Sequence, residues 1–353
     1  MTRKPRTTIA PSLASAPLNG ADPSKPTRRK ALALGLIACS TAAPWTASAQ
    51  TQRPQGWPQR PVKIVVPYAA GGSADTLGRL IADYLTTSLG QAFIIDNKGG
   101  AGGTLGSMGV SKAAPDGYTL VLSGIGSHVI APLQLANGMN PMKDFTHLAL
   151  LGGPPSALVI NADLPVKDIK GFIAYVNAAP KGLSWGSPGL GTHAQLIGQL
   201  FAASNNLNLV HISYKGAGPA VMDLLGGQIQ AGLMTLRSAS AHIQSGKLRA
   251  LAITSVKRLE DYPLVPTFAE LGYPALTALT WFSVSGPAGM PAAIVTTLNT
   301  EIRKGLRSPA MKKQLALEGV ETQDLDPEQL NQFFQSEITR WSPLIKTLKS
   351  PAS

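Results

Sequence analysis

The stretch that decides the fold is VKIVVPYAAGGSADTLGRL, residues 62–80. Its first five residues are mostly apolar and predict a short buried strand, which Pro67 ends because proline cannot donate a ladder hydrogen bond. From Leu77 onward apolar residues recur at helical spacing, which predicts a helix with Ser73 as its N-cap and Asp75 in its first turn. The connection between them is built from small residues, so a ligand can approach its backbone closely.

A connection of this kind is suited to binding an anion. A helix begins with N–H groups that have no intrahelical partner, and its dipole favours negative charge there. An ordinary strand-to-helix connection is the alternative interpretation, because such turns are common in α/β folds. We expect a ligand carboxylate to contact Tyr68, Ala69, Ala70, Gly71, Gly72, Ser73 and Asp75.

The same pattern returns later in the chain. Residues 183–185 predict a strand, and GSPGLGTH, residues 186–193, is again a small-residue run before a helical pattern. Ligands of open α/β sheets bind beyond the carboxyl ends of the strands. We therefore expect two turns to face each other across a cleft. The second turn would contribute Ser187, Gly189, Gly191, Thr192 and His193.

Composition places the chain among α/β proteins that do not bind nucleic acid. Short apolar runs alternate with helical patterns, and 353 residues suffice for two lobes with a sizeable core. The net charge of +12 is uneven, because residues 1–49 hold seven Lys/Arg and one acid, which leaves 24 basic and 18 acidic residues elsewhere. The remaining charges form no basic run with interleaved aromatic residues, which argues against nucleic-acid binding.

Residues 1–49 have the features of an export signal. Basic residues ending at Lys30 precede an apolar run too short to span a bilayer, and Ala47-Ser48-Ala49 is a small-residue cleavage site. We expect cleavage after Ala49 and a periplasmic location, with lipid anchoring through Cys39 as the alternative. Arg28-Arg29 leaves both Sec and twin-arginine export open. Because Cys39 is the only cysteine, a chain cleaved after Ala49 has no thiol.

The sequence contains no recognisable catalytic or metal-binding motif. The five histidines have no pair at metal-ligand spacing, neither small-residue turn completes G-x-S-x-G, and no P-loop is present. Gly100, Gly102 and Gly106 follow a strand, but their spacing departs from the dinucleotide fingerprint and favours a close packing loop. We therefore expect no catalytic residue, no cofactor and no metal.

Taken together, the motifs resemble those of Bug-type receptors, the periplasmic substrate-binding proteins of tripartite tricarboxylate transporters. The likeness runs in order through residues 57–345. The motifs include Val65-Val66-Pro67, Gly71-Gly72-x-x-Asp75, Gly100-Ala101-Gly102-Gly103, Pro115-Asp116-Gly117-Tyr118, Gly186-Ser187, Tyr214-Lys215-Gly216, Asp223-Leu224-Leu225-Gly226-Gly227-Gln228 and Pro287-Ala288-Gly289.

The resemblance implies a type II periplasmic binding fold, in which two lobes of mixed sheets and helices close on a ligand like a Venus flytrap. After a linker at 50–56, one lobe would comprise residues 57–160 and 280–353, and the other residues 161–279. The two small-residue turns would hold the ligand carboxylate, partly through waters. Two further loops and one strand position would complete the cleft through Ser123, Ser127, His128, Tyr214, Lys215 and Met234.

Three departures from the family pattern bear on the ligand. Ala69-Ala70 stands where a proline pair is common, Gln195 where a histidine is common, and Met234 where an acid is frequent. From Met234 we expect a ligand less cationic and more apolar than an amino acid. The resemblance also implies a monomer that delivers a small carboxylate to the transporter's membrane components. An exported α/β hydrolase, and a sensor that presents its ligand to a membrane kinase, are the alternatives.

Overall fold

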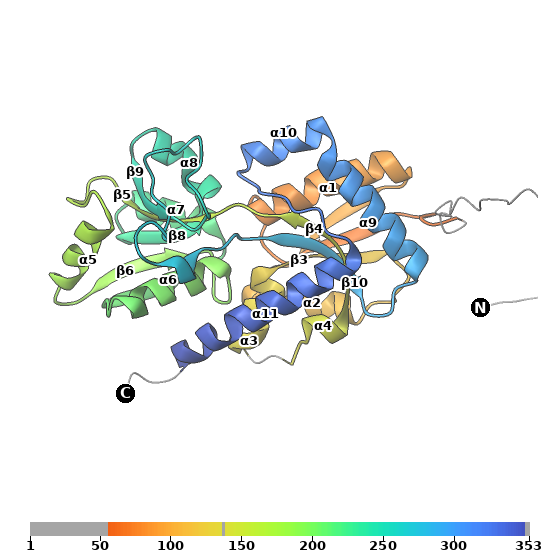
Figure 1. Cartoon of the computed structure of the whole chain (residues 1–353), viewed down its shortest axis with the longest axis horizontal. Helices are drawn as coiled ribbons and strands as arrows, with labels where there is room; N and C mark the ends of the chain where they lie inside the picture. The colour runs from red at the N-terminus through yellow and green to blue at the C-terminus, as the bar shows by residue number, and fades with distance from the viewer. Residues whose placement is uncertain (1–55, 136–137, 350–353) are drawn as a thin grey trace, which may run out of the picture. The chain divides into compact units, whose positions relative to one another are not determined.

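The computed structural model describes residues 56–135 and 138–349, and the predicted export signal lies outside them. The described strands form two five-stranded sheets (Figure 1). The first sheet has the order β2-β1-β3-β10-β4 and the second β7-β6-β8-β5-β9. The strands are β1 Val62–Val66, β2 Phe93–Asn97, β3 Thr119–Gly124, β4 Phe145–Gly152, β5 Ser156–Asn161, β6 Leu183–Ser187, β7 Leu209–Ser213, β8 Ala231–Thr235, β9 Leu248–Ile253 and β10 Phe282–Pro287.

Both sheets are mixed, because β10 runs antiparallel to β3 and β4, and β5 runs antiparallel to β8 and β9. Helices connect the strands. They are α1 Ser73–Leu89, α2 Thr104–Ser111, α3 Ala131–Leu135, α4 Pro141–Asp144, α5 Ile169–Asn177, α6 His193–Ser204, α7 Ala217–Leu225, α8 Leu236–Gln244, α9 Ala292–Arg307, α10 Pro309–Leu317 and α11 Pro327–Lys349, with short η1 Ala101–Gly103, η2 Gly126–Ile130 and η3 Pro274–Leu276. The predicted strand, turn and helix of residues 62–80 are β1, its connection and α1.

The chain crosses between the two sheets twice, and the crossing segments touch. Thr280 donates its N–H to the carbonyl of Pro154 at 2.9 Å. The first crossing ends at Ser156, which pairs with Thr235 of β8 in the second sheet. The predicted lobe boundary at 160 is therefore wrong, because β5 belongs to the second sheet. The crossing is marked by Gly152-Gly153-Pro154-Pro155, which separates two apolar runs of similar character.

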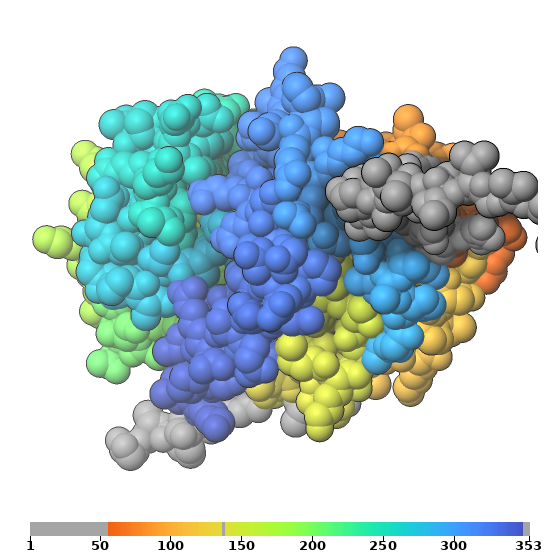
Figure 2. Space-filling view, turned by 45° about the vertical axis from the view of Figure 1, so that its right-hand side comes forward, coloured from red at the N-terminus to blue at the C-terminus, as the bar shows by residue number. Residues whose placement is uncertain are grey.

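Each sheet has a hydrophobic core on its faces. Residues of β1, β3, β4 and β10 pack against α1 and α9 in one core, and β8 and β9 pack against α7 and α8 in another. A third core joins α5 and α6 of the second sheet to α11 and to buried residues near β4 and η2. In the space-filling view the dark blue C-terminal segment lies against both the cyan and the yellow segments (Figure 2).

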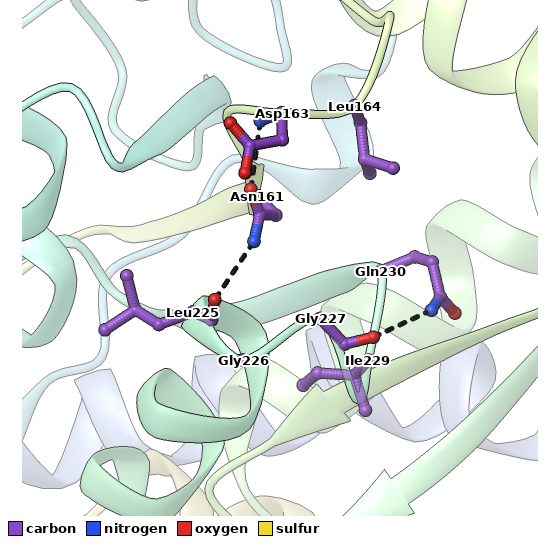
Figure 3. A pocket seen from close by; sticks show the side chains of 8 residues that line it. All are labelled: Asn161, Asp163, Leu164, Leu225, Gly226, Gly227, Ile229 and Gln230. Atoms are coloured by element: carbon purple, nitrogen blue, oxygen red, sulfur yellow. Dashed lines mark hydrogen bonds between the residues drawn. The ribbon is translucent and has the colours of Figure 1, made fainter.

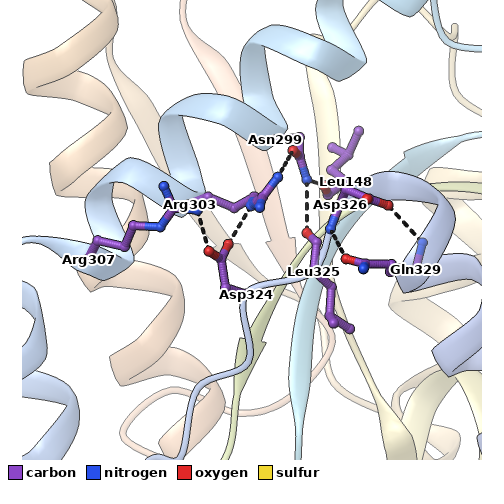
Figure 4. Close-up of polar contacts among 8 residues, drawn as sticks. All are labelled: Leu148, Asn299, Arg303, Arg307, Asp324, Leu325, Asp326 and Gln329. Carbon is purple, nitrogen blue, oxygen red and sulfur yellow. Dashed lines mark hydrogen bonds and ion pairs between the residues drawn. The ribbon is translucent and has the colours of Figure 1, made fainter.

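The start of α11 has a side-chain cap (Figure 4). Gln329 donates its N–H to Asp326 Oδ1 at 2.9 Å, and Asp326 donates its N–H to Gln329 Oε1 at 3.0 Å, which is a reciprocal capping box. Just before it, Asp324 pairs with Arg303 and Arg307 of α9. These contacts fasten the last helix to the first sheet.

None of the helices within 56–135 and 138–349 combines the length and apolar character that crossing a membrane requires.

Candidate functional site

The first turn, residues 68–75, connects β1 to α1. Ala69, Ala70 and Gly71 are exposed, and Gly71 has a left-handed backbone with φ +82°. Gly72 is the N-cap of α1, so the prediction that Ser73 caps this helix is wrong. Gly72 has the extended backbone of an N-cap, and Ser73 is the first helical residue, so the Ser73 hydroxyl makes another contact instead of a cap.

Asp75 organises the first turn from inside the helix. It accepts the Gly71 N–H at 3.0 Å, and it also binds Arg79 at 3.0 Å and the Asn97 amide at 3.0 Å. Asn97 donates as well to the carbonyl of Tyr68 at 3.2 Å. Burial alone would raise the pKa of the Asp75 carboxyl, but these donors outweigh it and hold the pKa below its ordinary value.

The second turn, residues 187–195, connects β6 to α6 in the same way. Gly191 is left-handed with φ +74°, and it donates its N–H to Gln195 Oε1 at 3.0 Å. Thr192 is the N-cap, and its hydroxyl oxygen accepts the Gln195 N–H at 3.2 Å. Gln195 was noted in the sequence only as a departure. Its side chain accepts the Gly191 N–H, just as the Asp75 side chain accepts the Gly71 N–H.

The structure brings the two turns together. A Cβ placed on Gly126 would lie 2.8 Å from the Tyr68 hydroxyl and 3.4 Å from the Gly191 carbonyl. A Cβ on Gly102 would lie 2.8 Å from the Leu190 carbonyl and 3.0 Å from the Gly191 Cα. The glycine-rich loop is thus a close packing loop, as predicted, and its partner is the second turn, which spacing alone did not reveal.

Hydroxyl groups link the first turn to the second sheet. Ser73 Oγ of α1 lies 3.2 Å from Thr235 Oγ1 at the end of β8, and Thr235 Oγ1 lies 2.8 Å from Ser238 Oγ. The first turn of α8 also carries Arg237, which pairs with Glu318 beyond α10 at 3.3 Å. These contacts link the connections that follow β1 and β8. Sequence reasoning missed Thr235, although its place one residue before a helix was a visible signal.

The loop of Ser123 to His128 is buried inside the first sheet's half of the structure. Ser123 belongs to β3 and bonds Ser285 Oγ at 2.7 Å, and His128 bonds Ser127 Oγ at 2.9 Å. Ser127 also hydrogen-bonds the Tyr68 hydroxyl, whose pKa burial raises. Ser127 therefore supports Tyr68, whereas Ser123 and His128 are directed into the interior.

His193 lies at the crossing segments. Its Nδ1 is 2.9 Å from Thr280 Oγ1, and Thr280 Oγ1 is 3.1 Å from Ser156 Oγ. The ring packs edge-on against Trp341 of α11. Burial lowers the pKa of His193 to about 3, so the imidazole is neutral at ordinary pH. This predicted ligand contact is directed toward the crossing, away from the exposed part of the second turn.

The remaining predicted residues divide between surface and core. Lys215 is exposed beside the second turn, while Tyr214 donates its hydroxyl to Asp223 at 2.7 Å, and burial with that contact raises its pKa to about 12. Met234 is 0% exposed and packs in the core formed with α7 and α8. Side chains alternate along β8, so Met234 lies on the opposite face from Leu233, which packs with α6. The predicted position of Met234 in the cleft is therefore wrong.

Two cavities lie elsewhere. One of about 300 Å³ is lined by the end of β5 and the turn after α7, including Asn161, Asp163 and Gln230 (Figure 3). The register of β5 on β8 places it at the opposite end of the second sheet from Thr235. Another of about 450 Å³ lies beside Lys63 and Lys98. Across the described residues, no group of three His, Cys, Asp or Glu side chains is placed to hold a metal ion.

A family profile described as tripartite tricarboxylate transporter family receptor matches residues 77–349. The chain belongs to this receptor family. Protein BugT of Bordetella pertussis is 37% identical over 292 residues, which cover 82% of this chain and 90% of that protein. The resemblance to Bug-type receptors is thereby confirmed.

Solved structures agree with the receptor's fold. An R. palustris protein with adipate is 33% identical, with a TM-score of 0.79 over 83% of this chain and 98% of that one. MatC from Rhodopseudomonas palustris with bound malate is 32% identical, with a TM-score of 0.77 over 82% of this chain and 100% of that one. The predicted two-lobed α/β fold with mixed sheets is confirmed.

Proposed function

We propose that this receptor captures a small carboxylate between the first turn and the second turn in the periplasm, and delivers it to the membrane components of a tripartite tricarboxylate transporter. The observation that carries the proposal is the convergence of the two turns at Gly126, where the Tyr68 hydroxyl and the Gly191 carbonyl approach one point. Each turn begins a helix, so it has N–H groups without intrahelical partners. The N–H groups of Gly71, Leu190 and Gly191 are bonded to side chains, and a ligand would use other N–H groups or displace these contacts.

We infer that main-chain groups of Ala69 to Ser73 and Gly189 to Thr192 make the principal contacts, with Tyr68, Ser73 and Lys215 beside them. In this proposal the turns are shaped by Asp75, Ser127 and Ser187. No direct ligand contact is assigned to the remaining predicted residues, Ser123, His128, His193, Tyr214 and Met234. One helix N-terminus contributes about 0.3–1 kcal/mol to an anion, whereas micromolar binding needs roughly 8 kcal/mol. Two turns, charge-assisted hydrogen bonds and exclusion of water are therefore all required.

The ligand class follows from chemistry and from relatives. The R. palustris protein was solved with adipate and MatC with malate, both of which carry two carboxylates. We propose a small carboxylate of this kind. The expectation of a ligand less cationic than an amino acid is not carried over, because Met234, on which it was based, lies in a hydrophobic core. A melting-temperature screen with mono-, di- and tricarboxylates tests the proposed ligand class, because a ligand at 100 times its Kd stabilises the folded state by about 2.7 kcal/mol.

Variants locate the binding site. Ser73→Ala with Thr235→Val should weaken binding of the best ligand from the screen, measured by calorimetry, because Ser73 belongs to the first turn and Thr235 contacts it. Asp163→Asn at the remote cavity is the matched control and should bind like the wild type. Loss of binding in the control with retention in the double variant would place the site elsewhere.

One observation favours a hydrolase as a second candidate. Ser187 Oγ lies 2.8 Å from His211 Nε2, which is the distance at which a base can activate a nucleophile. Ser187 is buried, however, and its hydroxyl is already used within the second turn. Turnover of a carboxylate ester that disappears in Ser187→Ala would support the hydrolase, and binding without turnover would support the receptor.

A further inference from the structure

The edge strand β7 supplies the side chains that hold the second turn from outside. His211 lies opposite Trp185 in the register of β6 and β7, and the two rings are 4.5 Å apart. Its Nε2 lies 2.8 Å from Ser187 Oγ, the only side-chain hydrogen bond that joins Ser187 to another strand among the described residues. Ser213, two residues on, accepts the Leu190 N–H at 3.0 Å.

The contact continues from Ser187 into the turn. Ser187 Oγ lies 3.3 Å from both the N–H and the carbonyl oxygen of Gly189, and Thr192 donates its hydroxyl to that carbonyl at 2.7 Å. Gly189 has φ +150° and Gly191 has φ +74°, values that glycine adopts without cost. Such a backbone has little stiffness of its own, so its conformation depends on the side chains that hold it.

His211 decides how the Ser187 hydroxyl is used. A serine hydroxyl has one proton and two lone pairs. When Nε2 of a neutral imidazole accepts a hydrogen bond from the Ser187 hydroxyl, both lone pairs of Ser187 Oγ remain available to the Gly189 N–H. Without the imidazole the hydroxyl can rotate toward the Gly189 carbonyl, where it competes with Thr192. We propose that His211 is a positioning residue that holds the second turn ready for the ligand carboxylate, an inference that rests on the proposed function.

The first test needs no ligand. In His211→Ala the amide of Gly189 should exchange hydrogen about 3–10-fold faster, the loss expected for one net hydrogen bond, while the amide of Gly71 in the first turn keeps its wild-type rate. His211→Gln, whose amide can replace the imidazole as a hydrogen-bond partner, should restore slow exchange. His242→Ala on α8 is the matched control. An unchanged rate at Gly189 in His211→Ala would overturn the inference.

The second test is a double-mutant cycle in ligand binding, with malate and adipate as probes in calorimetry. His211→Ala and Ser187→Ala should each weaken binding about 3–10-fold, and the double variant should be no weaker than the worse single variant, because both act through one contact. Independent, additive losses would overturn the inference while leaving the proposed function intact. If Gly189 exchanges faster in His211→Ala but the wild type binds neither probe, the result would instead count against the ligand class.

Discussion

The first turn and the second turn begin α1 and α6 with the same local geometry. In each, a left-handed glycine donates its N–H to the side chain four residues later, Gly71 to Asp75 and Gly191 to Gln195. The acceptor is a carboxylate in the first turn and a neutral amide in the second. A carboxylate needs Arg79 and Asn97 to balance it, whereas an amide needs no counter-charge.

This difference bears on how an anion can be held between the turns. The negative charge of Asp75 is offset within its own helix by Arg79, so neither turn presents an uncompensated charge. In the proposed function, selection of a carboxylate then rests on main-chain N–H groups and on Lys215 at the surface. The comparison leads to four tests, and the expected effects decrease from the first to the last.

The largest expected difference between the two turns is in how acid changes their contributions to stability. Burial holds the pKa of His193 at about 3, so below pH 6.5 the unfolded chain binds a proton that the folded chain does not. Stability is therefore lost as the pH falls from 6.5 to 3, by roughly 1.4 kcal/mol per pH unit for this histidine. The stabilisation from Asp75 is present above about pH 3.8 and is lost only below it, because its folded pKa is lowered.

Urea unfolding of His193→Gln between pH 4 and 7 checks this expectation. The slope of unfolding free energy against pH should become shallower by about 1.4 kcal/mol per pH unit, without vanishing, because burial also lowers the pKa values of His128 and His147. Asp75→Asn is the control and should keep the wild-type slope above pH 4. An unchanged slope in His193→Gln would contradict the account.

Alanine at the two left-handed glycines should be the next largest contrast. Both substitutions impose backbone strain of about 1–2 kcal/mol. A Cβ at Gly71 meets nothing within 4 Å, but a Cβ at Gly191 lies 2.8 Å from the Ala131 Cβ, which adds an overpacking cost of about 1–3 kcal/mol. Urea unfolding should show Gly191→Ala to be the less stable variant, and equal losses would mean that the second turn can move away from Ala131.

Removing the side-chain acceptors should give a smaller contrast. Asp75→Ala should cost about 2–3 kcal/mol of unfolding free energy, because it also leaves Asn97 and Arg79 without their partner. Gln195→Ala should cost about 1–2 kcal/mol, the loss of one buried hydrogen bond. Denaturant midpoints measured at pH 7 compare them, and a larger loss for Gln195→Ala would show that the turns are not held in the same way.

The smallest expected effect is optical. Trp185 is buried just before the second turn, whereas Tyr68 is the aromatic residue of the first. Binding of a carboxylate should change the tryptophan emission by a modest fraction, and Trp185→Phe should remove most of that change. If Trp185→Phe keeps the full signal, another tryptophan reports on binding and Trp185 does not.

The sequence predicted the parts of this structure that depend on local patterns. Apolar periodicity indicated β1 and α1. The sequence did not reveal that β5 belongs to the second sheet, because strand pairing depends on contacts distant in the chain. It also could not show whether Met234 faced a cleft, since one residue of register decides the face of a strand.

For the candidate site, small residues and helix starts located both turns. Their side-chain support was hidden, because Gln195 and His211 carry no motif and act through a single contact each. Gly102 was predicted to allow close packing, but its partner Gly191 lies far away in sequence. Local signals therefore identified the two turns, and only the fold could identify the side chains that hold their backbone in place.

The position of β10 in the first sheet has a consequence for biosynthesis. Because β10 stands between β3 and β4, the strand β4 joins β2-β1-β3 in one sheet only after residues 282–287 have been made. The core around Phe334 and Trp341 forms later still, because it needs the final helix. Completion of the first sheet and of this core therefore depends on the last part of the chain to leave the ribosome.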